Sequence, residues 1–161
     1  MVELVPANTR ENLSEIKRLF DEYTAALGFD LHFQEYEREY AELPGEYAEP
    51  YGRLYLVLYG KKIAGCVALR KLEDSVCEMK RMYVKPVFRG KGIGRAMAHK
   101  VIDEARRIGY KRMRLDTIDT MKPAISLYKS LGFKEIAPYR YNPIKGACYM
   151  ELVLTDSNES R

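Results

Sequence analysis

The sequence has few of the residues that build metal sites or disulfide frameworks. Its 161 residues include three cysteines, two histidines and no tryptophan. The cysteines, Cys66, Cys77 and Cys148, are odd in number and widely spaced, and no CxxC motif is present. This spacing argues against both a zinc site and a disulfide framework. Two histidines alone cannot form a His-rich metal site, so we expect a reaction without a metal.

Long apolar segments are absent as well. The longest strongly apolar run, residues 54–59, is far shorter than the ~20 residues of a membrane-spanning helix. The first six residues lack a basic region followed by an apolar stretch, so we expect no signal peptide, no membrane partner and a cytoplasmic protein. Hydrophobic residues make up 47% of the chain, which excludes a disordered protein, and the length is typical of one domain.

Basic residues are concentrated in the middle of the chain. Residues 80–114 contain twelve Lys or Arg and two acidic residues, a local charge of +10, although the formal net charge of the whole chain is +4. This pattern indicates either an anionic ligand or a solvated basic helix face, and charge alone favours neither. We expect no nucleic-acid partner, because the sequence has no RNA-binding aromatic pattern and no recognition-helix signature.

Apolar periodicity, together with the glycines and prolines, predicts one α/β (α+β) domain. Asn8 is expected to cap the first helix, with Glu11 completing a capping box, and Gly28 to end it. Further helices are expected at residues 33–43, 93–108 and 123–131. Strands are expected at residues 2–5, 54–59, 63–69, 75–85, 113–117, 133–136 and 147–154. This order predicts a mixed sheet with helices packed on it over residues 1–154, followed by a polar tail at 155–161.

A glycine-rich turn lies between the strand expected at 75–85 and the helix expected at 93–108. Gly90, Gly92 and Gly94 fall at the helix start, where backbone N–H groups lack partners and the helix dipole is positive. Without a Cβ at these positions, a diphosphate can approach the N–H groups closely. The alternative is a turn that only packs the helix on the strand, but three idle glycines would cost about 0.5–1 kcal/mol each. Three basic side chains flank the glycines: Arg89, Lys91 and Arg95.

Two common phosphate-binding loops do not fit this turn. A Walker loop ends in Gly-Lys-Ser/Thr, whereas Gly92 is followed by Ile93. A dinucleotide fingerprint counted from Gly90 requires glycine at position 95, which is Arg95.

Two segments together resemble the GNAT N-acetyltransferase superfamily. The pattern Arg89-x-x-Gly92-x-Gly94, after a strand that ends in Val84-x-Pro86, is similar to the acyl-CoA pyrophosphate loop of that superfamily. Residues 124–133 are similar to its penultimate helix and the turn that follows. Met121 departs from the pattern, because many members have an asparagine there that contacts the cofactor. The resemblance implies a GNAT-like acyl-CoA N-acyltransferase fold with a mostly antiparallel sheet, and acetyl-CoA as cosubstrate.

The resemblance also implies how the cosubstrate is held. The strand ending at Val84 would diverge from its neighbour, and the backbone of Met82, Tyr83 and Val84 would bind the pantetheine arm. The N–H of Met82 would face the thioester oxygen, as an oxyanion donor. The diphosphate would lie on Arg89, Gly90, Lys91, Gly92, Ile93, Gly94 and Arg95.

The implied reaction is direct attack of a neutral amine on the thioester, after which a thiolate leaves. Tyr128 matches the tyrosine that similar enzymes place near the sulfur, and it is the candidate general acid. The alternative for Tyr128 is a core aromatic residue on an amphipathic helix. Glu78 is the candidate general base, because strand alternation places it on the same face as Met82 and Val84. The alternative for Glu78 is a structural ion pair with Lys80 or another basic neighbour.

The acceptor is expected to bind to the first half of the chain and to the loop at residues 138–146. The candidate contacts are His32, Tyr36, Tyr139, Tyr141 and Asn142. The sequence therefore predicts an acetyl-CoA-dependent N-acetyltransferase that acts on a primary amine of a small molecule. Two alternatives stay open: a non-catalytic CoA-binding sensor or regulatory module, and an acetyltransferase acting on a protein or peptide amine. An exposed sheet edge suggests a homodimer.

Overall fold

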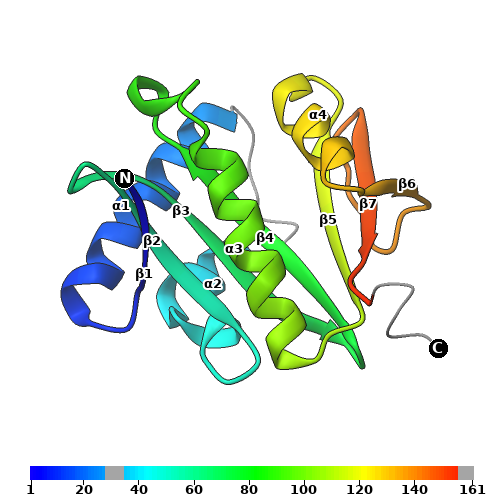
Figure 1. Cartoon of the computed structure of the whole chain (residues 1–161), viewed down its shortest axis with the longest axis horizontal. Coiled ribbons are helices and arrows are strands. Elements are labelled where there is room, and N and C mark those ends of the chain that lie inside the picture. The colour runs from blue at the N-terminus through cyan, green and yellow to red at the C-terminus, as the bar shows by residue number, and fades with distance from the viewer. Residues whose placement is uncertain (28–34, 156–161) are drawn as a thin grey trace.

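Seven strands form one sheet in the computed structural model, which describes residues 1–27 and 35–155 (Figure 1). The strands are β1 (Val2–Pro6), β2 (Arg53–Tyr59), β3 (Lys62–Glu73), β4 (Val76–Val84), β5 (Arg112–Ile118), β6 (Lys134–Ile136) and β7 (Ala147–Val153). The helices are α1 (Arg10–Leu27), α2 (Tyr36–Glu42), α3 (Ile93–Ile108) and α4 (Lys122–Ser130), with short 3-10 helices at Gly45–Tyr47 and Pro86–Phe88.

The strand order in the sheet is β1-β2-β3-β4-β5-β7-β6. Only the pairing of β4 with β5 is parallel, because α3 carries the chain back across the sheet between these two strands. All other described pairs are antiparallel. The predicted fold class, a single domain with a mixed and mostly antiparallel sheet, is confirmed.

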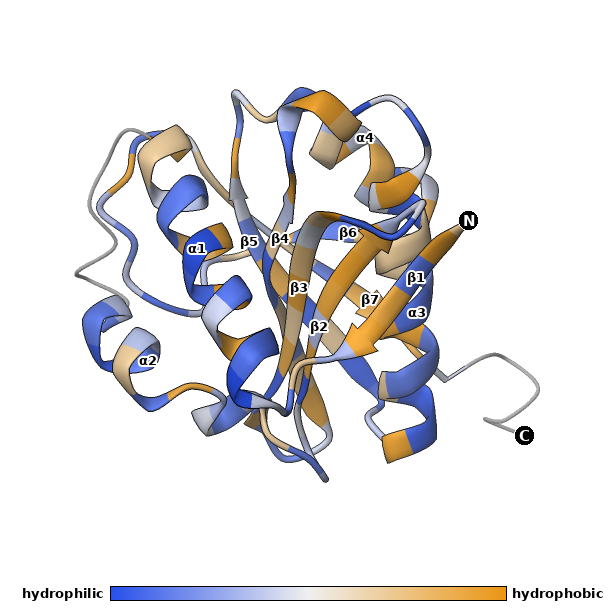
Figure 2. Cartoon of the chain, turned by 90° about the vertical axis from the view of Figure 1, so that its left-hand side faces the viewer, coloured by the Kyte–Doolittle hydropathy of each residue, from blue (hydrophilic) through white to orange (hydrophobic). Residues whose placement is uncertain are grey.

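Helices cover both faces of the sheet (Figure 2). On one face, buried residues of α3 and α4 such as Met97, Val101 and Tyr128 pack on Val57 and Met79 of the sheet. On the other face, the buried side of α1 packs on β2, β3 and β4, and two tyrosines of α2 contact the same cluster. None of the described helices is both long and apolar enough to cross a bilayer.

Most predicted element boundaries agree with the structure to within two residues, and three features differ. The first helix is capped by Thr9 instead of Asn8: Thr9 Oγ1 accepts a hydrogen bond from the N–H of Asn12 at 3.1 Å. The strand predicted at 63–69 continues to Glu73, because a tight turn at residues 74–75 lets it pair with β4 along its full length. The start of the helix predicted at 33–43 and the tail from residue 156 lie outside the described residues.

A β-bulge in β4 determines which side chains reach the site. Ala68 of β3 pairs with Lys80 and Cys66 pairs with Tyr83, so a single β3 residue lies opposite two residues of β4. Arg81, in this bulge, has the left-handed φ of 56°. The bulge reverses the alternation of side chains, so Met82 and Val84 pack on the α3 face together with Met79. The prediction that Glu78 shares a face with Met82 and Val84 is therefore wrong.

From Met79 onward, β4 runs without a partner on one side. It pairs with β5 only from Val76 to Glu78, opposite Arg112 to Arg114. The remaining residues of the two strands diverge, as the sequence resemblance implied, and leave an opening in the middle of the sheet.

Candidate active site

Two connected cavities occupy the opening between β4 and β5. A wide cavity of about 610 Å³ lies between the end of β4, the glycine turn and α4. A narrow cavity of about 110 Å³ lies between β4 and β5 and reaches Tyr128. The two cavities share five of their lining residues: Tyr23, Leu27, Met82, Met121 and Ala124.

The glycine turn forms one wall of the wide cavity. Gly90 and Gly92 have positive φ angles of 79° and 80°, and a Cβ added at either position would meet no atom within 4 Å. Gly92 is also the N-cap of α3, so the unpaired N–H groups of the first helical turn face this open space. An open backbone cradle at a helix N-terminus fits a diphosphate.

The three basic side chains of the turn lie differently from one another. Arg89 lines the wide cavity and donates from Nε to the carbonyl oxygen of Val84 at 3.0 Å. Arg95 donates from Nη2 to Ser130 Oγ at 3.0 Å, which links α3 to α4. The Lys91 ammonium lies 5.9 Å from the centre of the Tyr59 ring. The backbone cradle with Arg89 is thus the core of the predicted diphosphate site, and Lys91 and Arg95 lie outside the cavity lining.

The unpaired edge of β4 forms a second wall of the wide cavity. Met82, Tyr83 and Val84 all line it, together with Ile93 and Gly94 from the start of α3. The structure therefore brings the two predicted cofactor-binding segments, the end of β4 and the glycine turn, into one groove.

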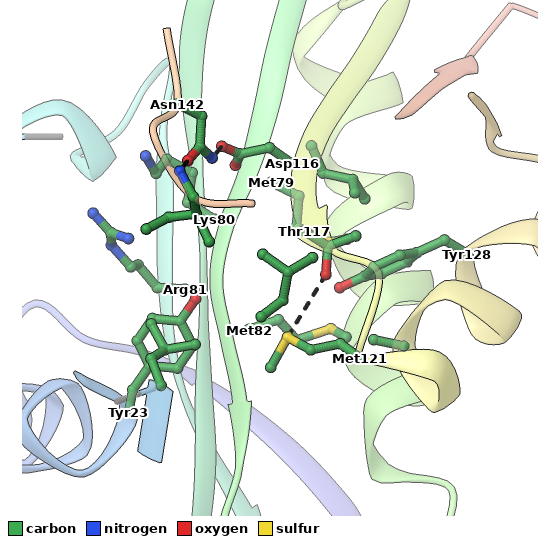
Figure 3. Close-up of a pocket in the computed structure, with 15 residues that line it drawn as sticks. Tyr23, Met79, Lys80, Arg81, Met82, Asp116, Thr117, Met121, Tyr128 and Asn142 are labelled. Carbon is green, nitrogen blue, oxygen red and sulfur yellow. Dashed lines mark hydrogen bonds between the residues drawn. The ribbon is translucent and has the colours of Figure 1, made fainter. Parts of the chain in front are cut away.

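Tyr128 projects from α4 into the narrow cavity (Figure 3). Its side chain is buried and its ring packs against Phe133 at a centroid distance of 5.7 Å. Burial raises the pKa of the Tyr128 hydroxyl, so this group keeps its proton at neutral pH. No described residue forms a hydrogen bond with this hydroxyl, which leaves its proton available to a ligand in the cavity.

Glu78 is a fully buried carboxylate on the opposite face of the sheet, and it lines neither the wide nor the narrow cavity. It accepts hydrogen bonds from Arg70 Nε at 2.9 Å and from the Tyr139 hydroxyl at 2.7 Å, and it forms an ion pair with Arg140. Burial alone would raise the pKa of Glu78, but the charges of Lys80, Arg140 and Arg70 outweigh burial and hold it below its ordinary value. These contacts favour the structural ion pair that the sequence left open for Glu78.

A third, charged cavity of about 470 Å³ lies between α2, the 3-10 helix at Gly45–Tyr47 and the loop that carries Arg140 and Tyr141. Of the predicted acceptor contacts, Tyr141 lines this cavity and Asn142 lines the narrow one. Tyr36 packs on Phe20 and Tyr40, and Tyr139 is committed to Glu78, so neither lines a described cavity. His32 lies outside the described residues.

Sequence reasoning missed two polar residues of this region. Lys80 lines both the narrow and the charged cavity. No other residue in the part of the chain that the structure describes lines both of them. Asp116 of β5 lines the narrow cavity, and Asn142 Nδ2 and Arg140 Nη1 each lie 3.5 Å from its Oδ2. Asp116 lies in a strand that alternates apolar and polar residues, so no sequence signal distinguished it from an ordinary exposed strand residue.

Part of the positive charge in residues 80–114 is compensated by acidic residues outside this segment. Acidic residues from distant segments pair with four of its twelve basic side chains. These pairs are Arg81 with Glu39, Lys85 with Glu22, and Arg112 and Arg114 with Glu151. Within residues 1–27 and 35–155, no group of three or more His, Cys, Asp or Glu side chains is arranged to hold a metal ion.

Comparison with known proteins points to one family. The sequence profile of the acetyltransferase (GNAT) family matches residues 15–133. An N-acetyltransferase of Schizosaccharomyces pombe is 38% identical over 148 residues, with 90% of each chain covered. An N-acetyltransferase of Dictyostelium discoideum is 32% identical and covers 83% of this chain and 90% of its own.

Solved structures share the fold. A GNAT-family acetyltransferase of Staphylococcus aureus superimposes with a TM-score of 0.76 and 21% identity, covering 96% of this chain and 100% of that one. An acetyltransferase of Salmonella typhimurium, solved with acetyl-CoA, gives a TM-score of 0.69 and 21% identity, covering 96% of this chain and 95% of that one.

Proposed function

Because the chain belongs to the acetyltransferase (GNAT) family, we propose that it transfers the acetyl group of acetyl-CoA to a primary amine of a small molecule. The observation that carries this proposal is the single groove that joins the glycine turn, the unpaired edge of β4 and the hydroxyl of Tyr128. A small acceptor is supported by the size of the narrow cavity, about 110 Å³.

The residues of the groove fit acetyl-CoA, which the Salmonella neighbour contains. The N–H groups around Gly92 would hold the diphosphate, with Arg89 beside it. The backbone of Met82 and Val84 would bind the pantetheine arm along the unpaired strand edge. Acetyl-CoA supplies the activated acyl group, and its thioester would reach the narrow cavity, where the N–H of Met82 can stabilise the developing oxyanion.

Two proton transfers are needed for the reaction. An alkyl ammonium acceptor must first lose a proton, and we assign this proton to Asp116, directly or through a water, because Asp116 lines the cavity where the amine must react. The neutral nitrogen then forms the C–N bond, and the C–S bond breaks. Tyr128 donates its proton to the leaving sulfur and regains a proton from the new amide nitrogen. The sequence predicted Glu78 as the general base. In this proposal the general base is Asp116.

Removing the Tyr128 hydroxyl tests the chemical step. We expect Tyr128→Phe to lower kcat by roughly 10²–10⁴-fold while the Kd for acetyl-CoA is unchanged, because the hydroxyl would act only on the leaving group. The measurements are thiol release with a primary-amine panel and calorimetric titration of acetyl-CoA. Tyr51→Phe, at an exposed tyrosine outside the cavities, is the matched control. An unchanged kcat in Tyr128→Phe would remove the assigned role.

Asp116→Asn tests the other proton transfer. Without the carboxylate of Asp116, the site cannot remove the proton from an ammonium acceptor. Only the acceptor that is already a free amine in solution can then react, so the rate of the variant should rise with pH across the pKa of the acceptor. We expect the loss of kcat/KM to be about 10²-fold at pH 7 and much smaller at pH 10. A loss that does not change with pH would assign Asp116 to folding or positioning.

The same assays separate the alternatives. Thermal stabilisation by CoA without turnover on any amine would support a CoA-binding sensor, and turnover on peptide amines alone would support a protein acceptor. The cytoplasmic location, the homodimer and the absence of nucleic-acid and membrane partners stay predictions.

A further inference from the structure

We propose that the acceptor carries a carboxylate close to its primary amine, and that Lys80 and Arg140 bind this carboxylate. This inference rests on the proposed acetyltransferase function and narrows its substrate class. The juxtaposition behind it is a reaction cavity and a charged cavity that meet at one lysine.

Lys80 connects the place of reaction to the charged cavity. The narrow cavity contains Tyr128 and Asp116, and the charged cavity contains Arg140 and Arg70, while Lys80 lines both. In Figure 3, Lys80 and Asn142 lie on the side of the narrow cavity opposite Tyr128. An acceptor with its amine beside Asp116 therefore directs its other end toward Lys80 and Arg140.

Four buried or partly buried cations surround this passage, against three such carboxylates: Glu39, Glu78 and Asp116. The other glutamates that line the charged cavity are exposed: Glu35, Glu42 and Glu46. Arg81 donates two hydrogen bonds to the carboxylate of Glu39, at 2.8 and 2.9 Å. Arg70 and Arg140 share the carboxylate of Glu78. The second partner of Arg70, Glu46, is largely exposed, and the second partner of Arg140 is Asp116, at 3.5 Å. Nη2 of Arg140 is buried and lies in ionic contact with Glu78. The guanidinium group of Arg140 and the ammonium group of Lys80 both line the charged cavity, so a carboxylate there can form charge-assisted hydrogen bonds.

The charges of the neighbouring arginines give the passage a positive potential. Burial and the charges of Arg81, Arg140 and Arg70 lower the pKa of Lys80 to about 8, against the opposing charge of Glu78. The pKa of the Glu78 carboxyl is also lowered, despite its burial. A site that disfavours a further cation and stabilises an anion will attract a carboxylate. A carboxylate bound there would also lie close to the ammonium group of Lys80.

The short path from Asp116 to Lys80 limits the distance between the two groups of the acceptor. Both residues line one cavity of about 110 Å³, so the amine and the carboxylate must be separated by only a few bonds. This spacing is found in α- and β-amino acids.

Matched acceptor pairs test the inference. The pairs are L-alanine with L-alaninamide, L-phenylalanine with L-phenylalaninamide, and β-alanine with β-alaninamide, assayed by thiol release from acetyl-CoA. Each amide keeps the primary amine and the size of its acid but removes the charge. Its amine is also less basic, which biases the comparison against the proposal. We expect kcat/KM for at least one acid to exceed that of its amide by ten- to a hundredfold, the range of charge-assisted hydrogen bonds.

Lys80→Met should remove this preference by raising KM for the acid, while the Kd for acetyl-CoA stays unchanged. Lys80→Arg, which keeps the charge, should restore part of the preference. The matched control is Lys71→Met, which removes an exposed lysine of β3 whose partner is Asp74. Equal or better turnover of every amide, or a preference that persists in Lys80→Met, would overturn the inference and leave the proposed function intact.

Thermal shift separates failure of the inference from failure of the proposed function. In the presence of CoA, the preferred acid should raise the Tm of the protein and its amide should not. A shift that is specific to the acid, without any acetylation, would support the carboxylate site and reject the acetyltransferase proposal. No acid-specific shift and no turnover would reject both.

Discussion

Glu78 shows how one buried side chain balances the charges beside the site. Its carboxylate contacts Arg70, Arg140 and the Tyr139 hydroxyl, so removing its charge leaves cations without compensation. Breaking one partner of a buried ion pair costs about 3–5 kcal/mol. At the residue scale, Glu78 therefore stabilises the fold and, through Arg140, positions one wall of the acceptor path.

We expect Glu78→Gln to lower the free energy of unfolding by about 3–5 kcal/mol at pH 7. The pKa of Glu78 lies below its ordinary value of 4.5 in the folded state, so its stabilisation is present at neutral pH and is lost as pH falls below that value. The difference between wild type and variant should thus shrink on acidification, as measured by urea unfolding between pH 7 and pH 3. Glu73→Gln, at an exposed ion pair with Arg114, should cost at most about 1 kcal/mol. A difference that stays constant with pH would contradict the assigned anionic state.

Side chains with a local motif were predictable, and side chains placed by distant contacts were not. Tyr128 and the glycine turn belong to short patterns, and both lie in the predicted groove. Glu78 was placed on the wrong face, because simple alternation ignores the bulge at Arg81. Lys80 and Asp116 were missed, because their role follows from the meeting of β4, β5 and the 138–146 loop, which single-sequence patterns do not encode.

At the scale of elements, the bulge in β4 depends on a glycine in the neighbouring strand. The carbonyl oxygen of Tyr83 lies only 2.0 Å from where a Cβ of Gly65 would be, so the two backbones approach more closely than any other residue at position 65 allows. The order of elements was predictable from periodicity and turn residues, whereas this contact between β3 and β4 was not. A strand glycine is a weak signal for a bulge and does not specify its register.

We expect Gly65→Ala to destabilise the protein by about 1–3 kcal/mol or more, because the backbone of β4 must move away from the new methyl group. The displaced segment contains Met82 and Val84, so KM for acetyl-CoA should rise as well. Urea unfolding and steady-state kinetics measure the two effects. The control is Gly60→Asn in the β2–β3 turn, where φ is 56° and nothing lies within 4 Å of the added Cβ. Wild-type stability and KM in Gly65→Ala would show that β4 does not require the close approach.

At the scale of the whole molecule, the sheet consists of two parts joined by a short contact. Strands β1 to β4 and strands β5 to β7 meet only where Val76 to Glu78 pair with Arg112 to Arg114, with α3 as the covalent connection. The mixed topology was predictable from the βαβ order, but the extent of this junction was not. A ligand that lies in the groove and bonds to the free edge of β4 would add contacts across it.

Acetyl-CoA should therefore stabilise the molecule as a whole. At a ligand concentration of 100 times Kd, linkage predicts a gain of about 2.7 kcal/mol in the free energy of unfolding. Hydrogen exchange should slow most at the backbone N–H groups of Met82 and Val84 and at the glycine turn. Thermal unfolding and hydrogen exchange with and without acetyl-CoA measure this. Protection limited to distant elements would place the ligand elsewhere.

The divergence of β4 from β5 has a further consequence for solubility. Unpaired strand edges are the usual sites at which proteins aggregate, and most folds protect them with charges, bulges or covering segments. Here the unpaired backbone of β4 lines cavities whose other walls come from β5, α4 and the glycine turn. We expect these walls to hinder pairing with a strand of another protein, while a slender ligand can still reach the free backbone groups.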